Sequence, residues 1–429
     1  MVDDIVLDTA HGVVIFDEPE LPSYGWASLA GEPARRITQI ADLESDGVFI
    51  SNLSWQNLRS INAVKEPRLR PSNFFREELF AISQDLGIPL FEKPESCLHE
   101  LSEFFDRSIR LAAKIYGFER IGPSLKETIY QKLFPNGEPY SFGTPKIDDA
   151  FSEAYLPIQR CYVQNTSASR NAKLRFSRSH YASQLMAFPL PTGPWSVFKG
   201  ELPKNTNEIK KGEDCEVYKF LKEFGTTRPA LCCVSVRNID AACGALLGFT
   251  NGTERRNWVP IHEAAFLASI AEVTIKKMIE GNSYRTFDSL SYGWKEKSMV
   301  GDVSYSLGLV AEAHIAAITS ATKKPSSGHS YSPRAVFLKA WDRILLFKTA
   351  YILHQQDICV RSFAMGSINV SIEDHQIEFV AKAALEQNMT PPMWLFETCQ
   401  IDSDLGDGDS EQDVGGNELS LAEKASKYV

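Results

Sequence analysis

The chain has 429 residues, of which 43% are hydrophobic and 11% aromatic, and its formal net charge is −10. This composition excludes a wholly disordered or fibrous chain and predicts a soluble globular protein with two or more domains. No apolar run reaches the roughly 18 residues that a membrane-spanning helix needs, and the acidic start MVDDIVLDTAHG does not have the pattern of a signal peptide. We therefore expect a cytoplasmic protein with no membrane partner.

Residues 13–50 are expected to form strands. Four β-prone runs, VVIF, YGWASLA, RRITQIADL and GVFI, alternate with the turn-forming segments DEPELPS, GEP and ESD. This spacing favours consecutive antiparallel strands. A helix, SWQNLRSI, is expected directly after the fourth strand.

Helices are expected over 72–86, capped by Ser72, and over 96–117, ended by Gly117. Farther along, ALCCVSV predicts a buried strand, and residues 258–281 predict a helix with Pro260 in its first turn. The clearest helix covers 332–354, with Ser332 as N-cap. Two strands around residues 365–367 and a helix over 376–388 follow it.

This order of elements predicts an α/β or α+β protein. The expected segments are an N-terminal domain over 1–120, an α+β region over 121–290, a helix/β-hairpin/helix region over 291–399 and a disordered acidic tail over 400–429. The eight cysteines are scattered without a C-x-x-C pair, which favours reduced, buried thiols over disulfides or a zinc site.

The first segment resembles the start of an RNase H-like fold. The strand series leads into GVFISNL and then the helix SWQNLRSI, and the nearest likeness is to the RuvC-type branch. In that branch the first strand ends in a catalytic aspartate, and a strand rich in Gly and aromatic residues follows. Asp17 in VVIFDEP and Tyr24-Gly25-Trp26 stand in these two places. The resemblance implies an RNase H-like mixed sheet over about the first 60 residues.

The resemblance also implies a nuclease that uses Mg²⁺, because clustered carboxylates hold the metal ions that activate water. Asp17 would be the first metal ligand and a catalytic residue, with Glu18 or Glu20 assisting. The family's glutamate at the end of the fourth strand is replaced by Ser51-Asn52, and only Asp288 or Asp302 can be nominated as a later aspartate. The alternative is a sheet with solvated acids in its turn.

A basic strip, RCYVQNTSASRNAKLRFSRSHY, covers residues 160–181. Cations there can neutralise phosphates while aromatic rings stack on bases. The candidate nucleic-acid-binding residues are Arg160, Arg170, Lys173, Arg175, Phe176 and Arg178. The alternative is a solvated strand face whose cations pair with the protein's own acids.

Charge is unevenly distributed along the chain. Residues 400–429 hold eight acidic and two basic residues, a net charge of −6, which leaves −4 for the rest of the chain. Both EF-hand registers of DSDLGDGDSEQD fail, so we expect an acidic tail that competes with nucleic acid for the basic strip or recruits a basic protein partner.

Together these patterns predict a protein that binds or processes nucleic acid, DNA or RNA, with a metal-dependent RNase H-like nuclease domain that is degenerate. The alternative is a non-catalytic interaction or scaffold protein that acts through protein partners. P-loop, dinucleotide-binding and nucleophile-elbow motifs are absent from the sequence.

Overall fold

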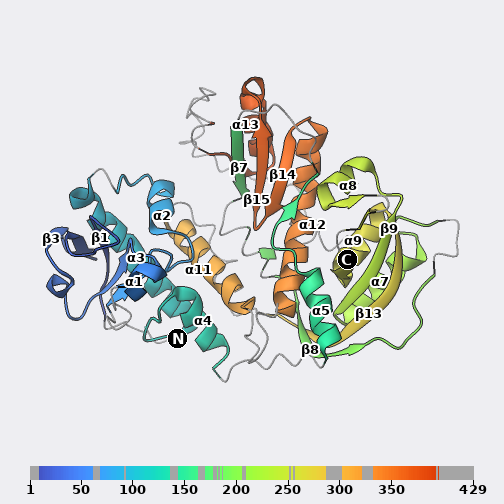
Figure 1. The fold of residues 1–429 in the computed structure, drawn as a ribbon, viewed down its shortest axis with the longest axis horizontal. Coiled ribbons are helices and arrows are strands. Elements are labelled where there is room, and N and C mark those ends of the chain that lie inside the picture. The colour runs from blue at the N-terminus through green and yellow to red at the C-terminus, as the bar shows by residue number, and fades with distance from the viewer. Residues whose placement is uncertain are drawn as a thin grey trace, which may run out of the picture. The chain divides into compact units, whose positions relative to one another are not determined.

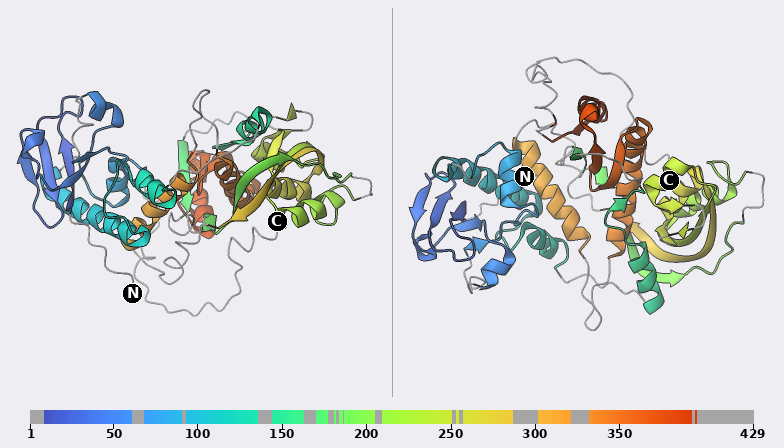
Figure 2. Two further views of the ribbon diagram at one scale, coloured as in Figure 1. Left: turned by 90° about the horizontal axis from the view of Figure 1, so that it is seen from below. Right: turned by 45° about the horizontal axis from the view of Figure 1, so that its top comes forward.

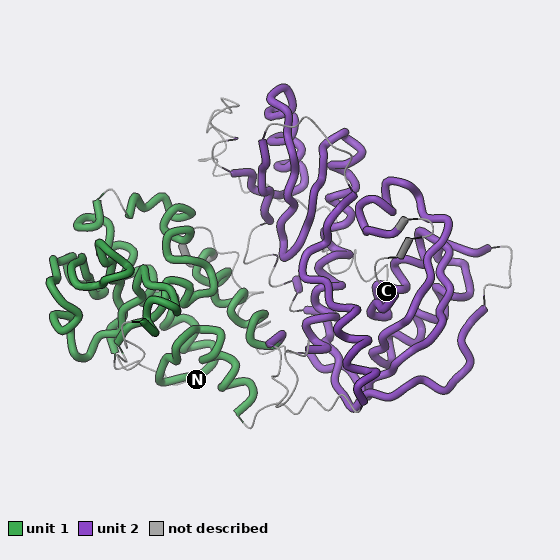
Figure 3. Tube along the Cα trace, viewed as in Figure 1, with its two compact units in different colours: residues 1–138, 290–318 green, residues 139–289, 319–429 purple. Residues whose placement is uncertain are grey.

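The computed structural model describes residues 9–60, 68–90, 93–135, 144–162, 170–176, 181, 184–185, 187–204, 209–250, 253–254, 257–286, 302–320, 332–392 and 395. The chain divides into two compact units (Figure 3). Unit 1 comprises Met1–Glu138 and Leu290–Ile318, and unit 2 comprises Pro139–Ser289 and Thr319–Val429. Both units combine sheets with helices, so the predicted α+β class is confirmed. The acidic segment 400–429 lies outside the described residues.

Unit 1 is built on a five-stranded mixed sheet of order β3-β2-β1-β4-β5 (Figure 1). Its strands are β1 His11–Phe16, β2 Gly25–Leu29, β3 Arg35–Ile37, β4 Val48–Ser51 and β5 Leu69–Arg70. The first three form an antiparallel meander, whereas β4 and β5 run parallel to β1. The prediction of a mixed sheet in this part of the chain is confirmed.

The expectation that β4 continues the antiparallel series was wrong. The chain between β3 and β4 includes a short 3-10 helix, Ile40–Asp42, and Leu43 after it packs in the same apolar cluster as Val14 of β1. This connection carries the chain from one edge of the meander to the far side of β1. A crossover of that kind brings the next strand in parallel.

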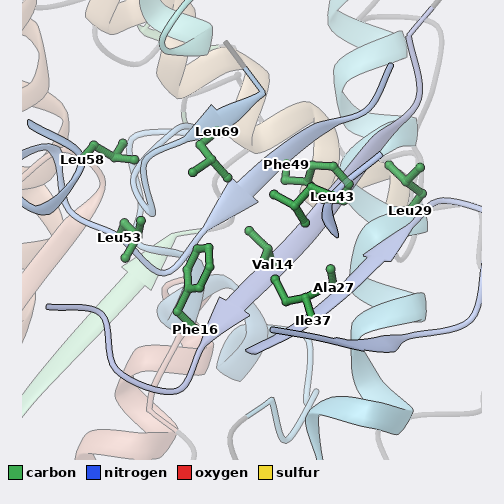
Figure 4. Close-up of a cluster of buried hydrophobic side chains, with 10 residues drawn as sticks. All are labelled: Val14, Phe16, Ala27, Leu29, Ile37, Leu43, Phe49, Leu53, Leu58 and Leu69. Carbon is green, nitrogen blue, oxygen red and sulfur yellow. The ribbon is translucent and has the colours of Figure 1, made fainter. Parts of the chain in front are cut away.

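Both faces of the central strand β1 are covered, which explains why all six of its residues are buried. On one face an apolar cluster gathers beneath helix α1 (Trp55–Ser60); its ten members are Val14, Phe16, Ala27, Leu29, Ile37, Leu43, Phe49, Leu53, Leu58 and Leu69 (Figure 4). On the other face lies helix α3 (Pro94–Tyr116), where Asp106 binds the buried His11 ring at 2.8 Å. Burial of each large apolar side chain contributes about 1.5–3 kcal/mol.

Gly25 allows β2 to approach β1 closely. A Cβ at this position would lie 2.2 Å from the carbonyl oxygen of Ile15, which no real side chain tolerates. The glycine of the Tyr24-Gly25-Trp26 pattern therefore has a packing role in this sheet.

Unit 1 also contains helices α2 (Leu79–Asp85), α4 (Leu125–Leu133) and α11 (Asp302–Ile318). Helix α2 begins seven residues after Ser72, where the sequence predicted the start, because Arg76 takes a positive φ of 82° that a helix does not accommodate. Helix α3 ends at Gly117 in the left-handed conformation, as predicted.

Helix α11 packs against α3 and α4 although it comes far later in the chain (Figure 2). The hydroxyl of Ser108 donates to that of Ser306 at 2.8 Å, and Tyr116 and His314 are hydrogen-bonded at 2.7 Å. Neither compact unit is thus continuous in sequence. The boundaries expected near residues 120, 290 and 400 stay predictions about independently folding domains.

Unit 2 contains an antiparallel four-stranded sheet of order β12-β9-β13-β8. Its strands are β8 Leu190–Val197, β9 Ala230–Arg237, β12 Trp258–Pro260 and β13 Glu272–Arg285. The neighbouring elements are α5 Pro145–Ala154, α7 Glu216–Thr227, α8 Ala241–Leu247, α9 Ile261–Ile270 and a small hairpin of β10 Phe249–Thr250 and β11 Thr253–Glu254.

The prediction of a single helix over 258–281 was wrong. Helix α9 ends at Ile270, and strand β13 starts two residues later. Val273 and Ile275 are buried on one side of this strand, and β-branched residues of this kind favour extended backbone. Tertiary pairing with β9 therefore decides the conformation of a run whose apolar spacing also fits a helix.

The second sheet of unit 2 is antiparallel, with the order β16-β7-β15-β14-β6. Its strands are β6 Gln159–Arg160, β7 Arg170–Phe176, β14 Cys359–Ala364, β15 Ser367–Ile372 and β16 Met389–Thr390. Helices α12 (Pro333–Gln355) and α13 (Ile377–Glu386) accompany it, with a 3-10 turn, Asp374–Gln376, between β15 and α13. The predicted helix, two-strand and helix series is confirmed.

Helix α12 is buried on nearly all sides. Its buried residues include Arg334, Asp342 and Arg343, and the last of these forms a doubly hydrogen-bonded ion pair with Glu263 of α9, at 3.0 and 2.6 Å. Within the described ranges, no helix combines the length and the apolar character needed to span a membrane.

Candidate nucleic-acid interface

The residues predicted to hold a metal lie where β1 enters its turn to β2. Asp17 is the first residue after β1 and is exposed, as are Glu18 and Glu20. Its carboxylate makes two contacts with the guanidinium of Arg36 on β3, one of them 3.1 Å long. Arg36 in turn lies 5.6 Å from the ring centre of Trp26. A metal ion at Asp17 would therefore have to displace a cation that the sheet already supplies.

Ser51 and Asn52 occupy the place where the resemblance calls for a glutamate. The Asn52 amide accepts a hydrogen bond from the Phe16 N–H at 3.0 Å and donates one to the Phe16 carbonyl at 2.8 Å. Ser51 is fully buried and donates its hydroxyl to the Arg70 carbonyl at 2.7 Å. Both side chains join the ends of neighbouring strands, and neither carries a charge.

The later aspartates expected at this site are not brought to it by any described contact. Asp288 lies outside the described residues, and Asp302 begins α11 with a side chain that is also outside them. Among the residues that the structure describes, no three His, Cys, Asp or Glu side chains gather closely enough to hold a metal ion. Catalysis by Asp17 and Glu18, with Asp17 as a Mg²⁺ ligand, stays a prediction.

Replacing Asp17 with Asn is expected to lower the free energy of unfolding by less than about 1 kcal/mol, because exposed ion pairs contribute little. We also expect millimolar Mg²⁺ to leave the midpoint of thermal unfolding of the unmodified protein unchanged, since a ligand stabilises only what it binds. Thermal unfolding with and without Mg²⁺ measures both. A Mg²⁺-dependent rise in the midpoint that Asp17→Asn removes would establish the metal site.

The basic strip falls on two strands of the second sheet of unit 2. Its described cations are Arg160 at the end of β6 and Arg170, Lys173 and Arg175 on β7; Arg178 lies outside the described residues. Burial alternates along β7, with Ala172 and Leu174 buried between the more exposed cations. Lys173 and Arg175 therefore share one side of the strand, as the two-residue period of a strand requires, whereas Arg170 starts the strand with the parity of the buried residues.

Phe176 lies on the buried side of β7. Its side chain is 8% exposed, and its ring stacks on that of Tyr181 with the ring centres 5.6 Å apart. The expectation that this ring stacks on a base is therefore corrected, because the ring is covered within the protein.

The cations of β6 and β7 share their face with polar residues of the two strands between them. Lys173 lies opposite Asn369, Asn369 opposite Ser362, and Ser362 opposite Arg160. Residues directly opposite one another in antiparallel strands point to the same side. The Asn369 amide also donates to the Ser362 hydroxyl at 2.9 Å. A polar row with a cation at each end thus crosses four strands.

A second polar group lies beside this row. Asn171 is opposite Ser371 and accepts a hydrogen bond from its hydroxyl at 2.8 Å. Arg361, at a bulge in β14, donates from Nε to the same hydroxyl. Arg175 lies opposite Ser367 of β15 and Thr390 of β16. We define the polar sheet face by the side chains of Arg160, Asn171, Lys173, Arg175, Arg361, Ser362, Asn369 and Ser371.

The opposite face of the same sheet is apolar and packed. Helix α12 packs against β14 and β15, and α13 packs against β16; Figure 1 shows β7, β15 and β14 side by side with α12 beside them. The fully buried residues of this side include Leu174, Phe363, Ile368 and Val370. A packed layer behind the sheet fixes the strand register, and with it the positions of the cations in front.

The turn between β14 and β15 is fixed from α12. Met365 and Gly366 both have positive φ, 46° and 69°, as in the two-residue turns that suit hairpins. The buried carboxylate of Asp342 accepts hydrogen bonds from their N–H groups at 2.6 and 3.3 Å and from the Tyr181 hydroxyl. Burial raises the pKa of Tyr181 well above its usual range, so this hydroxyl stays a donor.

Acidic residues border the polar sheet face at one end. Arg170, at the start of β7, forms an ion pair with Asp374 at 3.1 Å, and both side chains are about half exposed or more. Such a pair contributes little to stability. The cations of the polar sheet face itself are Arg160, Lys173, Arg175 and Arg361.

Sequence reasoning did not identify Arg361, Ser362, Asn369 or Ser371. Their signal was the alternation of polar and apolar residues in CVRSFA and SINVSI. The sequence does not show that these residues lie beside the basic strip, because Asn171 and Ser371 are 200 residues apart. Only the pairing of the strands brings them together.

The sequence matches no protein-family model, and no curated protein is significantly similar to it. Among solved structures, the chain is similar to Phi29 DNA polymerase complexed with primer-template DNA and incoming nucleotide substrates, with 10% identity, a TM-score of 0.46, and coverage of 86% of this chain and 82% of that one. For Phi29 DNA polymerase complexed with single-stranded DNA the values are 11%, 0.44, 86% and 81%. With scores in this range, function has to be inferred from the chain's own residues.

Proposed function

We propose that this protein binds nucleic acid and that the polar sheet face holds its phosphate backbone. The observation that carries this proposal is the row from Lys173 through Asn369 and Ser362 to Arg160, with Arg175 and Arg361 beside it. Lysine and arginine neutralise phosphates and release counterions on binding. Serine and asparagine side chains donate hydrogen bonds to phosphate oxygens, which positions the backbone without reading its sequence.

The distribution of charge supports this choice of ligand. Without residues 400–429 the chain has a net charge of only −4, and yet these cations gather on one sheet face. A local positive surface on a nearly neutral body attracts a polyanion through a few defined contacts rather than through the overall charge. Strands held by a packed layer place these contacts more exactly than a loop does.

We propose in addition that the RNase H-like sheet of unit 1 is a degenerate nuclease module that does not cleave. Two contacts support this. The carboxylate of Asp17 is engaged by Arg36, and the position of the missing glutamate is taken by Asn52, whose amide binds the backbone of β1. Metal-dependent cleavage needs clustered carboxylates with room for the ion.

Charge reversal at the centre of β7 tests the binding proposal. The double variant Lys173→Glu/Arg175→Glu is expected to weaken binding to a labelled oligonucleotide by at least about tenfold at moderate salt, and to lower the slope of log affinity against log salt by about 1.5, because two phosphate contacts are lost. Fluorescence anisotropy with single- and double-stranded DNA and RNA at several salt concentrations measures both quantities.

The matched control is Lys219→Glu/Lys222→Glu, which makes the same change of charge on the exposed side of α7, away from this sheet. It should reduce affinity by a factor of two or three at most, as a general charge effect. If the two double variants behave alike, the polar sheet face is not the binding surface. If the unmodified protein binds none of the four nucleic acids at low salt, the alternative of a scaffold acting through protein partners takes precedence.

A further inference from the structure

The acidic segment 400–429 has no part in the function proposed above. It holds six acidic residues within the twelve positions from Asp402 to Asp413, and two more at Glu418 and Glu423. Carboxylates and phosphates share the chemistry that arginine and lysine recognise, since both accept charge-assisted hydrogen bonds from these cations. A segment of this composition is therefore a candidate competitor for a surface that binds a nucleic-acid backbone.

The fold attaches this segment to the sheet that carries the cations. Strand β16, which ends at Thr390, is an edge strand of that sheet, and Thr390 lies directly opposite Arg175 of the polar sheet face. Leu395 is fully buried and its N–H donates to the Pro392 carbonyl, so the reach of the segment is counted from Leu395. The five residues from Leu395 to position 400 can span up to about 17 Å at 3.3 Å per residue. The five strands cover about 20 Å across, at roughly 4.8 Å per gap, which is a comparable distance.

We infer that residues 400–429 bind the polar sheet face of their own chain and compete there with nucleic acid. This inference rests on the proposed function of that face. The complementarity is direct, because a segment of net charge −6 is tethered beside Arg175, with Lys173 on the same strand, Arg361 on β14 and Arg160 on β6 at the far edge of the sheet. The segment occupies the polar sheet face in place of a nucleic acid. A nucleic acid must therefore displace the segment before it can bind.

Tethering makes even weak binding effective. A short connection of matching length gives an effective concentration of about 1 mM, so a segment that binds with a Kd of about 0.1 mM lowers the apparent affinity for nucleic acid roughly tenfold. Because both ligands act through charge, salt weakens the competition as well as the binding. The effect should therefore be largest at low salt.

The first experiment uses the full chain with the eight carboxylates of the segment replaced by their amides. The substitutions are Asp402→Asn, Asp404→Asn, Asp407→Asn, Asp409→Asn, Glu411→Gln, Asp413→Asn, Glu418→Gln and Glu423→Gln. We expect this variant to bind a labelled oligonucleotide about tenfold more tightly than the unmodified chain at low salt, with the two affinities converging at high salt.

The matched control replaces eight exposed carboxylates elsewhere in the chain by amides, which changes the net charge by the same amount. They are Glu32, Asp46, Glu95, Glu100, Glu119, Glu127, Glu213 and Glu223. Since none of them is tethered to β16, the control variant should gain at most about threefold in affinity from the general change in charge. An equal gain in the two variants would overturn the inference.

The second measurement does not involve nucleic acid. A labelled synthetic peptide of residues 400–429 is titrated with the amide-substituted chain, and we expect binding with a Kd of about 0.1 mM that Lys173→Glu/Arg175→Glu weakens at least fivefold. If the double variant leaves the Kd of the peptide unchanged, the segment binds elsewhere and the inference is overturned.

The outcomes separate the two proposals. If the unmodified and amide-substituted chains bind nucleic acid equally and the peptide does not bind, the competition is wrong while the proposed function stands. If neither chain binds nucleic acid at low salt, the proposed function is wrong and the competition falls with it, whether or not the peptide binds.

Discussion

Replacing Glu263 with Gln is expected to lower the free energy of unfolding by about 3–5 kcal/mol, which is a large part of the 5–15 kcal/mol typical of a folded domain. The carboxylate of Glu263 and the guanidinium of Arg343 are each only 2% exposed and share hydrogen bonds of 3.0 and 2.6 Å. Without the carboxylate, the buried Arg343 keeps its charge, and the Leu156 carbonyl at 3.0 Å cannot neutralise it. Chemical denaturation measures the loss.

An exposed ion pair of the same unit provides the matched control. Arg228 and Glu280 are 3.3 Å apart, but the Arg228 side chain is 59% exposed. Glu280→Gln should therefore cost less than about 1 kcal/mol. The double variant Glu263→Leu/Arg343→Met should cost less than Glu263→Gln alone, because it removes both buried charges and leaves none unpaired. Equal losses for Glu263→Gln and Glu280→Gln would mean that burial does not set the strength of these pairs.

Local sequence patterns were sufficient for much of the secondary structure. The runs VVIF and GVFI, helix α12 with Pro333 in its first turn and the two strands around Met365 all follow from residue preferences and turn signals within a few positions. They failed where a tertiary partner decides the outcome. Residues 272–285 pair with β9 and β8 rather than extending a helix, and β4 pairs with β1 in parallel. Sequence spacing alone does not distinguish these alternatives.

The candidate site was likewise only partly predictable from local sequence patterns. The basic strip was visible because its cations lie close together in the sequence, and the alternation along β7 placed Lys173 and Arg175 on one side of that strand. The partners that complete the face, Ser362 and Asn369, come from strands about 200 residues away, and their register is set by packing against α12. Asp17 likewise looked like a metal ligand until the fold placed Arg36 of β3 against it. Contacts between residues far apart in the sequence therefore decide whether a charged side chain faces a ligand or pairs within the protein.

Buried histidines are expected to make both units sensitive to mild acid. His262 of α9 is 2% exposed and stacked 3.9 Å from Trp341, and His314 of α11 is fully buried beside Tyr116. Burial lowers the pKa of His262 from 6.5 to about 3, with Glu263 opposing this shift and Arg343 adding to it. Burial likewise lowers the pKa of His314 to about 4.

Since both folded pKa values lie below the unfolded value, the unfolded chain binds protons first as the pH falls. The stability that the two neutral rings contribute is complete above about pH 6.5 and is lost progressively toward pH 4 and 3. At pH 5 the loss is about 2 kcal/mol for each histidine, from 1.5 pH units at 1.36 kcal/mol per unit. Denaturation at pH 7 and pH 5 measures the difference.

The variants His262→Phe and His314→Phe should each reduce this pH-dependent difference by about 2 kcal/mol, whatever they do to the stability at pH 7, because each removes one proton-binding group. The readout is a difference between two pH values, so a variant that is less stable overall remains informative. His99→Gln is the matched control, since its ring is 44% exposed and should leave the difference unchanged. If all three variants lose as much stability between pH 7 and pH 5 as the unmodified protein does, the two buried imidazoles do not govern the acid response.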